Sequence, residues 1–593
     1  MRNLFKYFFN IITLIIIILV ILAIDNSVHH PYHTPKNYIF ISIVPLVCLI
    51  SLIIGFRRNN SQLSFTIIET LLLVRITWLF ITNPTLWKST SLLGHWIILS
   101  LIVLTLLIRQ IADIIFIRAF ITSLFLLGTI QSIVGLFQHF TIREVPEGII
   151  KTVMIGTVGT ANGYGSFLAI SLIAGLYLLV KYRKKTFVLS TIIPIQILIL
   201  LSLMLNMSRG AILSLCVCIL LVTGYILYKK FNINLNLIYL ILPGLFLIFI
   251  IILYRINPES AKGRIMEWRI SLPMFIENPI KGIGYGRYAV EYLNYQGRFF
   301  ANGKHKQLEY KATNIKQAHN EYIQAFCEAG LIGGALFISI WVIAIYNLAK
   351  FSFNKNLNIE YVTTGLILLV LLIHSLVDTP LHVLPLSVVA YSILGTVPGK
   401  KYVFHISGKL KYLILAILIA YTGYTSHKLI YQYPAYKYWQ KGVYFANIQR
   451  MRLAEYEYRR ALKILKDNGE LLFHLGSSLV ISGDYTRGIY YLNKSRLNFN
   501  DRNIYLSLAL AYTRLKEYEK AIKYAEIAHN MFPDHLAPYL ILGEIYYYTG
   551  DYEKSKKSLI KCINRDTYIQ STDITQISMD ARNLWERFYN REH

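Results

Sequence analysis

The sequence predicts an all-α protein in which a polytopic membrane helical bundle of roughly 12–13 spans is followed by an α-helical repeat solenoid. Apolar runs of about 20 residues recur through the first two-thirds of the chain, with few charges inside them. The 593-residue sequence is 55% hydrophobic and has a mean hydropathy of +0.46, so this part cannot be a soluble fold. From about residue 436 the sequence changes to amphipathic helices that repeat with a period of roughly 34 residues.

Successive apolar runs define a membrane domain that is predicted to occupy residues 1–427. The first run follows Arg2 and Lys6 as a signal peptide would, but no small-residue cleavage site comes after it, so we expect a retained helix. The predicted spans cover residues 4–24, 38–56, 64–82, 92–108, 112–136, 158–180, 186–206, 210–228, 233–254, 330–349, 360–378, 383–398 and 410–427.

The basic residues predict the orientation of these spans. Lysine and arginine clusters follow alternate spans, so they share one face, which the positive-inside rule assigns to the cytoplasm together with Met1. A polar outer loop at about 255–329 and a C-terminal domain at 428–593 are then extracytoplasmic. The loop's own positive charge does not contradict this, because loops longer than about 60 residues are largely exempt from the rule. Losing the short span at 383–398, which contains Pro385, would move the C-terminal domain to the cytoplasm.

Charge and cysteine usage exclude several classes of partner. A formal charge of +28 would suggest nucleic acid for a soluble protein, but basic residues at helix ends account for it here, and we expect no nucleic-acid partner. The five cysteines form neither a disulfide framework nor a CxxC metal pattern. His374, Asp378 and His382 are spaced four apart, but Pro380 argues against one continuous helix that would bring them together. No Asp-x-Asp pair is present, and we expect no metal and no other cofactor.

The C-terminal domain contains an internal repeat. The turns 483–485, 517–519 and 550–552 are equivalent, and small residues recur on both sides of them. This pattern resembles the tetratricopeptide repeat (TPR), a helix-turn-helix unit whose small residues let two helices approach closely. We count three copies over about 470–559 and a degenerate copy that begins near Trp439. Such an array would offer a concave surface to a protein partner; the alternative is a helical plug that only stabilises the membrane domain.

Four motifs occur in a characteristic order. They are SRG at 208–210, RxxxW at 264–268, ENPIKGIGYG at 277–286 and AHNEYIQAFCEAGLIG at 318–333. Their order resembles the O-antigen ligase and polymerase superfamily of bacterial envelope glycosyltransferases, which includes the bacterial protein O-oligosaccharyltransferases. The resemblance covers roughly 155–335, and the large outer loop agrees with it.

The resemblance implies transfer of a glycan from an undecaprenyl-diphosphate carrier to an acceptor hydroxyl, with inversion, outside the bacterial inner membrane. The acceptor would be lipid A core, a protein serine or threonine, or a growing glycan. Guanidinium groups would stabilise the charge that develops on the departing diphosphate. The candidates are Arg209, Arg264 and Arg269. Alternatively, Arg209 is an interfacial arginine, and one of the other two is a solvated contact, since they need not share a helix face.

In this family, the histidine at the position of His319 is implicated in activating the acceptor. A neutral imidazole could take the hydroxyl proton near pH 7, although a lone histidine is often structural. Asn320 and Gln324 could contact substrate, or could cap the helix and bind water. Asn162, in the GTANGYG segment at 159–165, resembles an asparagine of the family and could contact the carrier; a flexible interfacial turn is the alternative.

Two glycine motifs are predicted to be structural. The GIGYG segment at 282–286 follows no strand, so it is a tight turn rather than a dinucleotide fingerprint. Gly330 and Gly333, after Glu328, permit close helix packing. Outside the enzyme class, a TPR-bearing membrane scaffold and a transporter remain alternatives. A transporter would show charges buried mid-span or paired broken helices, and neither is evident, while the motif positions of His319 and Arg209 favour an enzyme over a scaffold.

Overall fold

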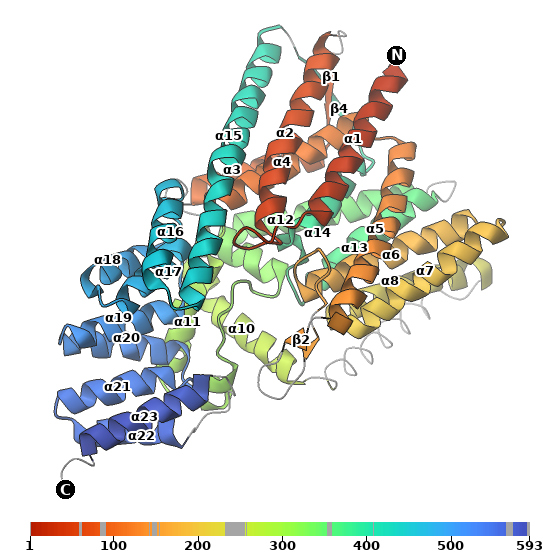
Figure 1. The fold of residues 1–593 in the computed structure, drawn as a ribbon. Helices are drawn as coiled ribbons and strands as arrows, with labels where there is room; N and C mark the ends of the chain where they lie inside the picture. Colours follow the sequence, from red (N-terminus) through yellow and green to blue (C-terminus); the bar gives the residue numbers. More distant parts are fainter. Residues whose placement is uncertain are drawn as a thin grey trace.

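The computed structural model describes residues 2–57, 62–83, 91–141, 143–144, 151–152, 154–231, 255, 258–352, 358–406, 408–564 and 573–589. Within these residues a bundle of long helices is joined to a stack of shorter ones (Figure 1), which confirms the all-α prediction. The bundle contains α1 (Arg2–Leu22), α2 (Thr34–Arg57), α3 (Ile67–Thr82), α4 (Ser91–Ile111), α5 (Ile114–Thr141), α6 (Ala161–Lys181), α7 (Thr186–Asn206), α8 (Arg209–Phe231), α12 (Glu321–Ser352), α13 (Ile359–His374), α14 (Leu384–Thr396) and the first part of α15 (Gly408–Asn447).

Eight of the described helices are long and apolar enough to cross a membrane, namely α2, α4, α5, α6, α7, α8, α12 and α15. The apolar parts of α1, α13 and α14 are shorter, and α3 has 16 residues. The predicted span at 233–254 lies outside the described residues. Helix α12 begins at Glu321, before the predicted span at 330–349, and its helical backbone is interrupted at Gly330. Its first turns carry buried polar residues.

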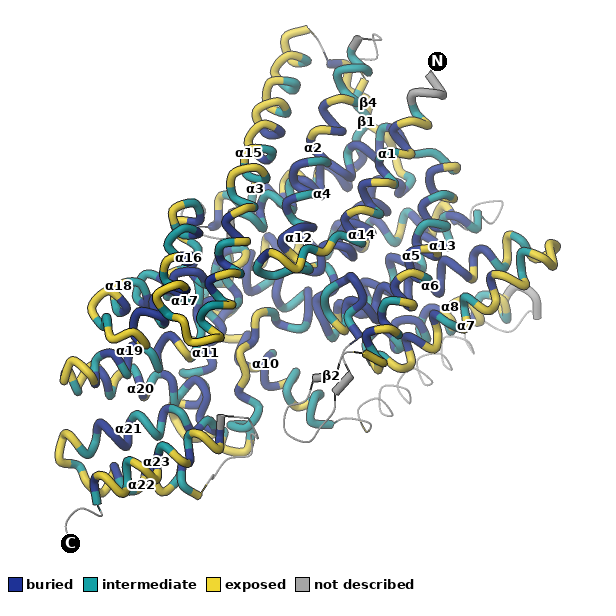
Figure 2. Tube along the Cα trace, viewed as in Figure 1, coloured by how far each residue is buried: buried dark blue, intermediate teal, exposed yellow. Residues whose placement is uncertain are grey.

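Helix α6 lies at the centre of the bundle, with α5, α7, α8 and α13 packed around it. Small residues allow this close packing: a Cβ added to Gly128 of α5 would lie 2.3 Å from Ser171 Cβ, and one added to Gly175 would lie 2.5 Å from the Gln196 side chain. Figure 2 shows the contrast between buried α6 and the exposed outer sides of α7 and α8. Those outer sides are apolar, with Ile197 61% exposed, as expected for a surface that faces lipid.

Short antiparallel ribbons connect bundle loops. β1 (Gln62–Phe65) pairs with β4 (Tyr402–His405), and β2 (Arg143–Glu144) pairs with β3 (Lys151–Thr152). The ribbon of β1 and β4 joins two loops of the face that was predicted to be cytoplasmic.

The polar segment folds into α10 (Pro258–Glu277), α11 (Tyr288–Ala301) and the 3₁₀ helix η1 (Lys306–Lys311). This segment packs against the repeat array: Gln296 Nε2 donates to the carbonyl of Met531 at 2.7 Å, and Asn500 Nδ2 donates to the carbonyl of Val290 at 2.8 Å. The polar segment and the array therefore lie on the same side of the bundle (Figure 1).

The repeat array consists of antiparallel helix pairs, as the periodicity predicts. The second part of α15 pairs with the next helix and forms the degenerate first copy, where a Cβ on Gly442 would lie 2.5 Å from Tyr458. Because α15 is one 40-residue helix, it crosses the predicted domain boundary at residues 427 and 428. The remaining helices are α16 (Met451–Ile464), α17 (Gly469–Ile481), α18 (Tyr485–Ser495), α19 (Arg502–Arg514), α20 (Tyr518–Met531), α21 (Ala537–Tyr548), α22 (Tyr552–Ile563) and α23 (Asp573–Tyr589).

Candidate active site

Helix α10 carries the RxxxW motif, and its tryptophan fixes the chain just before His319. Trp268 Nε1 donates to the carbonyl oxygen of Ala318 at 3.1 Å. The buried residues of α10 recur at helical spacing and face α12. Cys327 of α12 donates through Sγ to the carbonyl of Ser271 at 3.4 Å. The motif thus holds α10, the residue before His319 and α12 together.

The GIGYG segment is a turn, as predicted, and the structure shows that it packs against α12. Backbone N–H groups of this turn, at 282–286, donate to the carbonyls of Cys327 (2.9 Å) and Glu328 (3.0 Å). These carbonyls are available because α12 is interrupted at Gly330, which has φ 65° and ψ −168°. A Cβ on Gly330 would lie 2.1 Å from the carbonyl oxygen of Ile280. Gly330 therefore admits the outer-loop backbone, whereas the sequence argument had assigned it to helix packing.

His319 lies at the entrance of α12, opposite the segment that follows α13. His319 Nδ1 is 3.0 Å from Asp378 Oδ1. Because an ionised carboxylate can only accept, Nδ1 carries the proton and Nε2 keeps its lone pair. The Glu321 N–H donates to the carbonyl of Ser375 at 3.0 Å and holds the two segments together. His319 has φ +48°, a conformation that few non-glycine residues adopt and that is common at functional sites.

A largely buried pair of charges lies beside Asp378. Nη1 of Arg264 is 3.7 Å from Oε2 of Glu267, and within the described part of the chain neither atom has a hydrogen-bond partner. Burial raises the pKa of Glu267 to about 7; Asp378 adds to this shift and Arg264 opposes it. Burial lowers the pKa of Arg264, and the charge of Arg209 lowers it further. An anion placed between the two arginines would relieve their repulsion and supply Arg264 with acceptors.

Arg209 begins α8, where three helices converge. A Cβ on the adjacent Gly210 would lie 2.5 Å from His374 Nε2, so the start of α8 packs directly on the end of α13. Ser166 of α6 forms a hydrogen bond with His374 Nδ1. Asn162 is half-buried one turn before Ser166, on the same side of α6. Asn162 and Arg209 thus lie at adjoining helix starts next to the His319 segment.

The side chains of Asn320 and Gln324 serve the protein fold. Asn320 accepts from the first backbone N–H groups of α12, which is the capping role weighed for it, and donates to the carbonyl of Leu376 at 2.9 Å. Gln324 accepts from the Ala318 N–H at 3.0 Å, and its amide lies 3.1 Å from His382 Nε2. Both residues hold the neighbours of His319 in place.

A second polar cluster lines a cavity of about 290 Å³ inside the bundle. Glu321 and His382 form an ion pair there at 2.9 Å. Burial alone would lower the pKa of His382, but Glu321 and Glu328 raise it to about 9. Arg75 of α3 also lines this cavity and lies 4.9 Å from the ring centre of Phe337. Arg75 lies within the predicted span at 64–82, so the described residues do contain a charge buried in a span, contrary to the expectation from the sequence.

The structure brings most, but not all, of the predicted residues together. His319 contacts Asp378, and the charges of Asp378 and Arg209 both act on Arg264, while Asn162 lies at the start of α6, which packs on α8. Arg269 is exposed, and the five-residue spacing places it on a different face of α10 from Arg264. Sequence reasoning missed the roles of Asp378 and Glu267. Glu267 could have been identified from the sequence, because it lies within the RxxxW motif. Asp378 could not, because it lies too far along the chain from His319 for their spacing to indicate a pair.

Two family models match parts of the chain. The O-antigen ligase family model matches residues 194–338, which include the SRG, RxxxW and AHNEY motifs. A tetratricopeptide repeat model matches residues 503–534 and 536–567, within the array. No curated protein matches the chain.

Proposed function

Because the chain joins an O-antigen ligase domain to tetratricopeptide repeats, we propose that it transfers a glycan from an undecaprenyl-diphosphate carrier to an acceptor hydroxyl at the extracytoplasmic face of the bacterial inner membrane. One observation carries this proposal: the His319–Asp378 pair lies next to the Arg264–Glu267 pair and Arg209. A base and a phosphate-binding group, which glycosyl transfer from a diphosphate requires, thus share one site.

The proposed reaction is a single displacement at the anomeric carbon. The acceptor hydroxyl attacks this carbon, and its proton passes to His319 Nε2, which Asp378 orients through Nδ1. The bond between the anomeric carbon and the diphosphate oxygen breaks, and its electron pair stays on that oxygen. Arg264 and Arg209 stabilise the resulting negative charge. Attack from the face opposite the leaving group inverts the anomeric configuration. Arg269 is not included in this site, because it is exposed on α10.

The repeat array supports a protein as acceptor or assembly partner, since such arrays offer binding surfaces to proteins. Lipid A core and a growing glycan are the other acceptors open to a ligase or polymerase of this superfamily.

Deletion in the native host tests the function and separates the acceptors. The expected result is loss of one glycoconjugate class, restored by the wild-type chain but not by His319→Ala at equal membrane abundance. Loss of glycosylated proteins alone would support a protein acceptor, and loss of polymeric surface glycan a lipid or glycan acceptor. If both glycan classes stay unchanged after deletion, the proposed function is wrong.

A further inference from the structure

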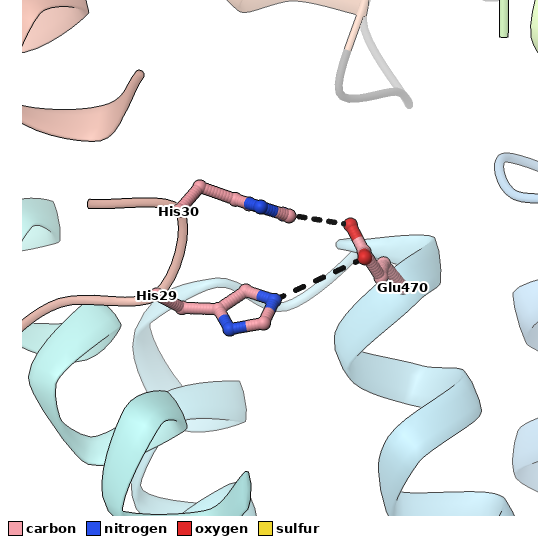
Figure 3. A group of neighbouring side chains, drawn as sticks. All are labelled: His29, His30 and Glu470. Atoms are coloured by element: carbon pink, nitrogen blue, oxygen red, sulfur yellow. Dashed lines mark hydrogen bonds and ion pairs between the residues drawn. The ribbon is translucent and has the colours of Figure 1, made fainter. Parts of the chain in front are cut away.

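A cluster of metal-binding side chains lies outside the proposed active site, where the loop after α1 meets the repeat array. His29 and His30 of this loop both point toward Glu470 in the first turn of α17 (Figure 3). Nε2 of His30 is 3.1 Å from Oε2 of Glu470, and Nε2 of His29 is 3.9 Å from Oε1. One donor atom from each residue lies within 4.8 Å of the other two.

These separations suit a small divalent cation. Zinc binds imidazole nitrogen and carboxylate oxygen at about 2.0–2.2 Å in tetrahedral geometry, which places ligand atoms about 3.3 Å apart. The His30–Glu470 distance is close to this value, and a movement below 1 Å by His29 would satisfy the other. Two imidazoles and one carboxylate favour zinc and similar transition ions, whereas magnesium prefers oxygen ligands.

The environment of His29 provides an independent indication of a cation. His29 Nδ1 lies 3.4 Å from Gln440 Oε1, an acceptor, so Nδ1 carries the proton and the Nε2 lone pair faces the Glu470 carboxylate. Nε2 is buried and has no hydrogen-bond partner among the described residues. A lone pair that faces a carboxylate is repelled unless a cation lies between them. A metal-binding histidine commonly donates its other ring N–H to a neighbouring acceptor, as His29 does.

The local fold holds both imidazoles in place. The His29 N–H donates to the carbonyl of Tyr436 at 3.1 Å, and its ring stacks on Trp439 at 4.1 Å between ring centres. His30 has φ +57°, an uncommon conformation for a residue with a side chain, and this turns the two neighbouring rings to one side. The contacts to α15 and the unusual backbone orient the pair before any ligand binds.

The surroundings of the cluster leave space for a further ligand. A cavity of about 200 Å³ borders His30 and Glu470 and leaves room for water as a fourth ligand.

We propose that His29, His30 and Glu470 form a zinc site that fastens the repeat array to the membrane domain. The ligands come from the loop after α1 and from α17, so the ion would bridge two parts of the chain more than 400 residues apart in sequence. This site is independent of the proposed transfer chemistry, because its residues are separate from those around His319.

Zinc binding to the full-length protein in detergent, stripped with EDTA and studied at pH 7.5, tests this site. We expect about one equivalent of bound zinc by elemental analysis after desalting, a higher melting temperature with ZnCl₂, and no effect of MgCl₂. Cobalt(II) should give the intense visible absorption of a four-coordinate ion. The His29→Ala/His30→Ala double variant and Glu470→Gln should lose all three effects, whereas His405→Ala, which removes an exposed histidine of β4, should retain them.

A variant of Gln440, which contacts His29 Nδ1, keeps the test decisive if the double variant does not fold. Gln440→Ala leaves all three ligands in place and should weaken zinc binding about 10- to 100-fold. Absence of zinc binding by the wild-type protein would show that protons alone bridge the cluster. Equal stoichiometry in wild type and Glu470→Gln would place the metal elsewhere. Either result overturns the proposal without affecting the proposed function.

Discussion

His319 and Asp378 are far apart in the sequence but in contact in the structure, and we expect a different role for each. His319→Ala should reduce transfer by about 10²–10⁴-fold, because it removes the group that takes the acceptor proton. Asp378→Asn keeps a hydrogen-bonding group but can donate to Nδ1, which would put the ring proton on Nε2 and block the base. Rates should be measured with saturating donor. Near-normal transfer by a well-folded His319→Ala protein would remove the residue from the mechanism.

Arg264 and Arg209 are both partly buried, and we expect that lysine cannot replace either of them. A lysine supplies a point charge but not the two-pronged guanidinium that grips a phosphate, so Arg264→Lys and Arg209→Lys should each weaken donor binding by roughly tenfold or more. Arg269→Lys is the matched control on the exposed side of α10 and should bind donor normally. Titration of the lipid-linked donor measures all three. The same loss in the control would return Arg269 to the binding site.

Glu267 predicts how donor affinity depends on pH. Its pKa is raised to about 7, mainly by burial, so it is neutral below this pH and ionised above it. When ionised, Glu267 competes with the diphosphate for Arg264 and also repels the diphosphate. Donor affinity should therefore fall as pH rises, by up to about tenfold between pH 6 and pH 8. Glu267→Gln should bind more tightly at pH 8 and show a flatter profile; a wild-type-like pH slope in this variant would contradict the role.

At the scale of elements, the interruption of α12 brings two motifs together. Gly330→Ala forces a side chain into φ +65° and against Ile280, so it should lower stability by roughly 1–3 kcal/mol and impair transfer. Gly423→Ala is the matched control in α15, where an added Cβ meets no atom within 4 Å, and it should raise stability by about 0.5–1 kcal/mol. Thermal unfolding in detergent compares the two. Similar shifts in both variants would mean that Gly330 does not hold the loop.

The sequence predicts helices that depend on local hydrophobicity. It does not predict features that depend on contacts between residues far apart in the chain. The apolar runs predict helices such as α6 and α8, because hydrophobicity alone determines a span. A helical entry near Asn320 was expected from the sequence, but the hydrogen bonds that hold Glu321 to the segment after α13 were not. The motifs identified His319 and Arg264, while Asp378 became a partner only through folding. His29 and His30 had no sequence signal that linked them to Glu470.

At the scale of the whole molecule, α15 is one continuous helix that links the membrane domain to the repeat array. A cut near Lys428 would break this helix and expose the array-facing side of α11, where Gln296 is fully buried. The four motifs all end by residue 333 and the array begins beyond the last predicted span, so the sequence alone would favour independent domains. Because α11 contacts the array, the role of the array is better tested with full-length variants. These keep α15 intact and replace single residues at the interface between α11 and the array. The array and the outer loop thus pack together on one side of the bundle.

Because the outer loop and the array lie on the same side of the bundle, cysteine labelling can test the orientation of both relative to the membrane. Asn302→Cys in the outer loop and Glu519→Cys in the array are exposed positions on the same side of the bundle, and Lys184→Cys is exposed in a loop predicted to be cytoplasmic. Of the five native cysteines, four are buried and one is partly buried, so background labelling should be low.

A membrane-impermeant maleimide applied to intact spheroplasts should label Asn302→Cys and Glu519→Cys but not Lys184→Cys until the membrane is opened. Labelling of Lys184→Cys alone would reverse the orientation and place the proposed site on the cytoplasmic side, where transfer outside the membrane could not occur. Labelling of only one of the other two would contradict the packing of the array on the outer loop.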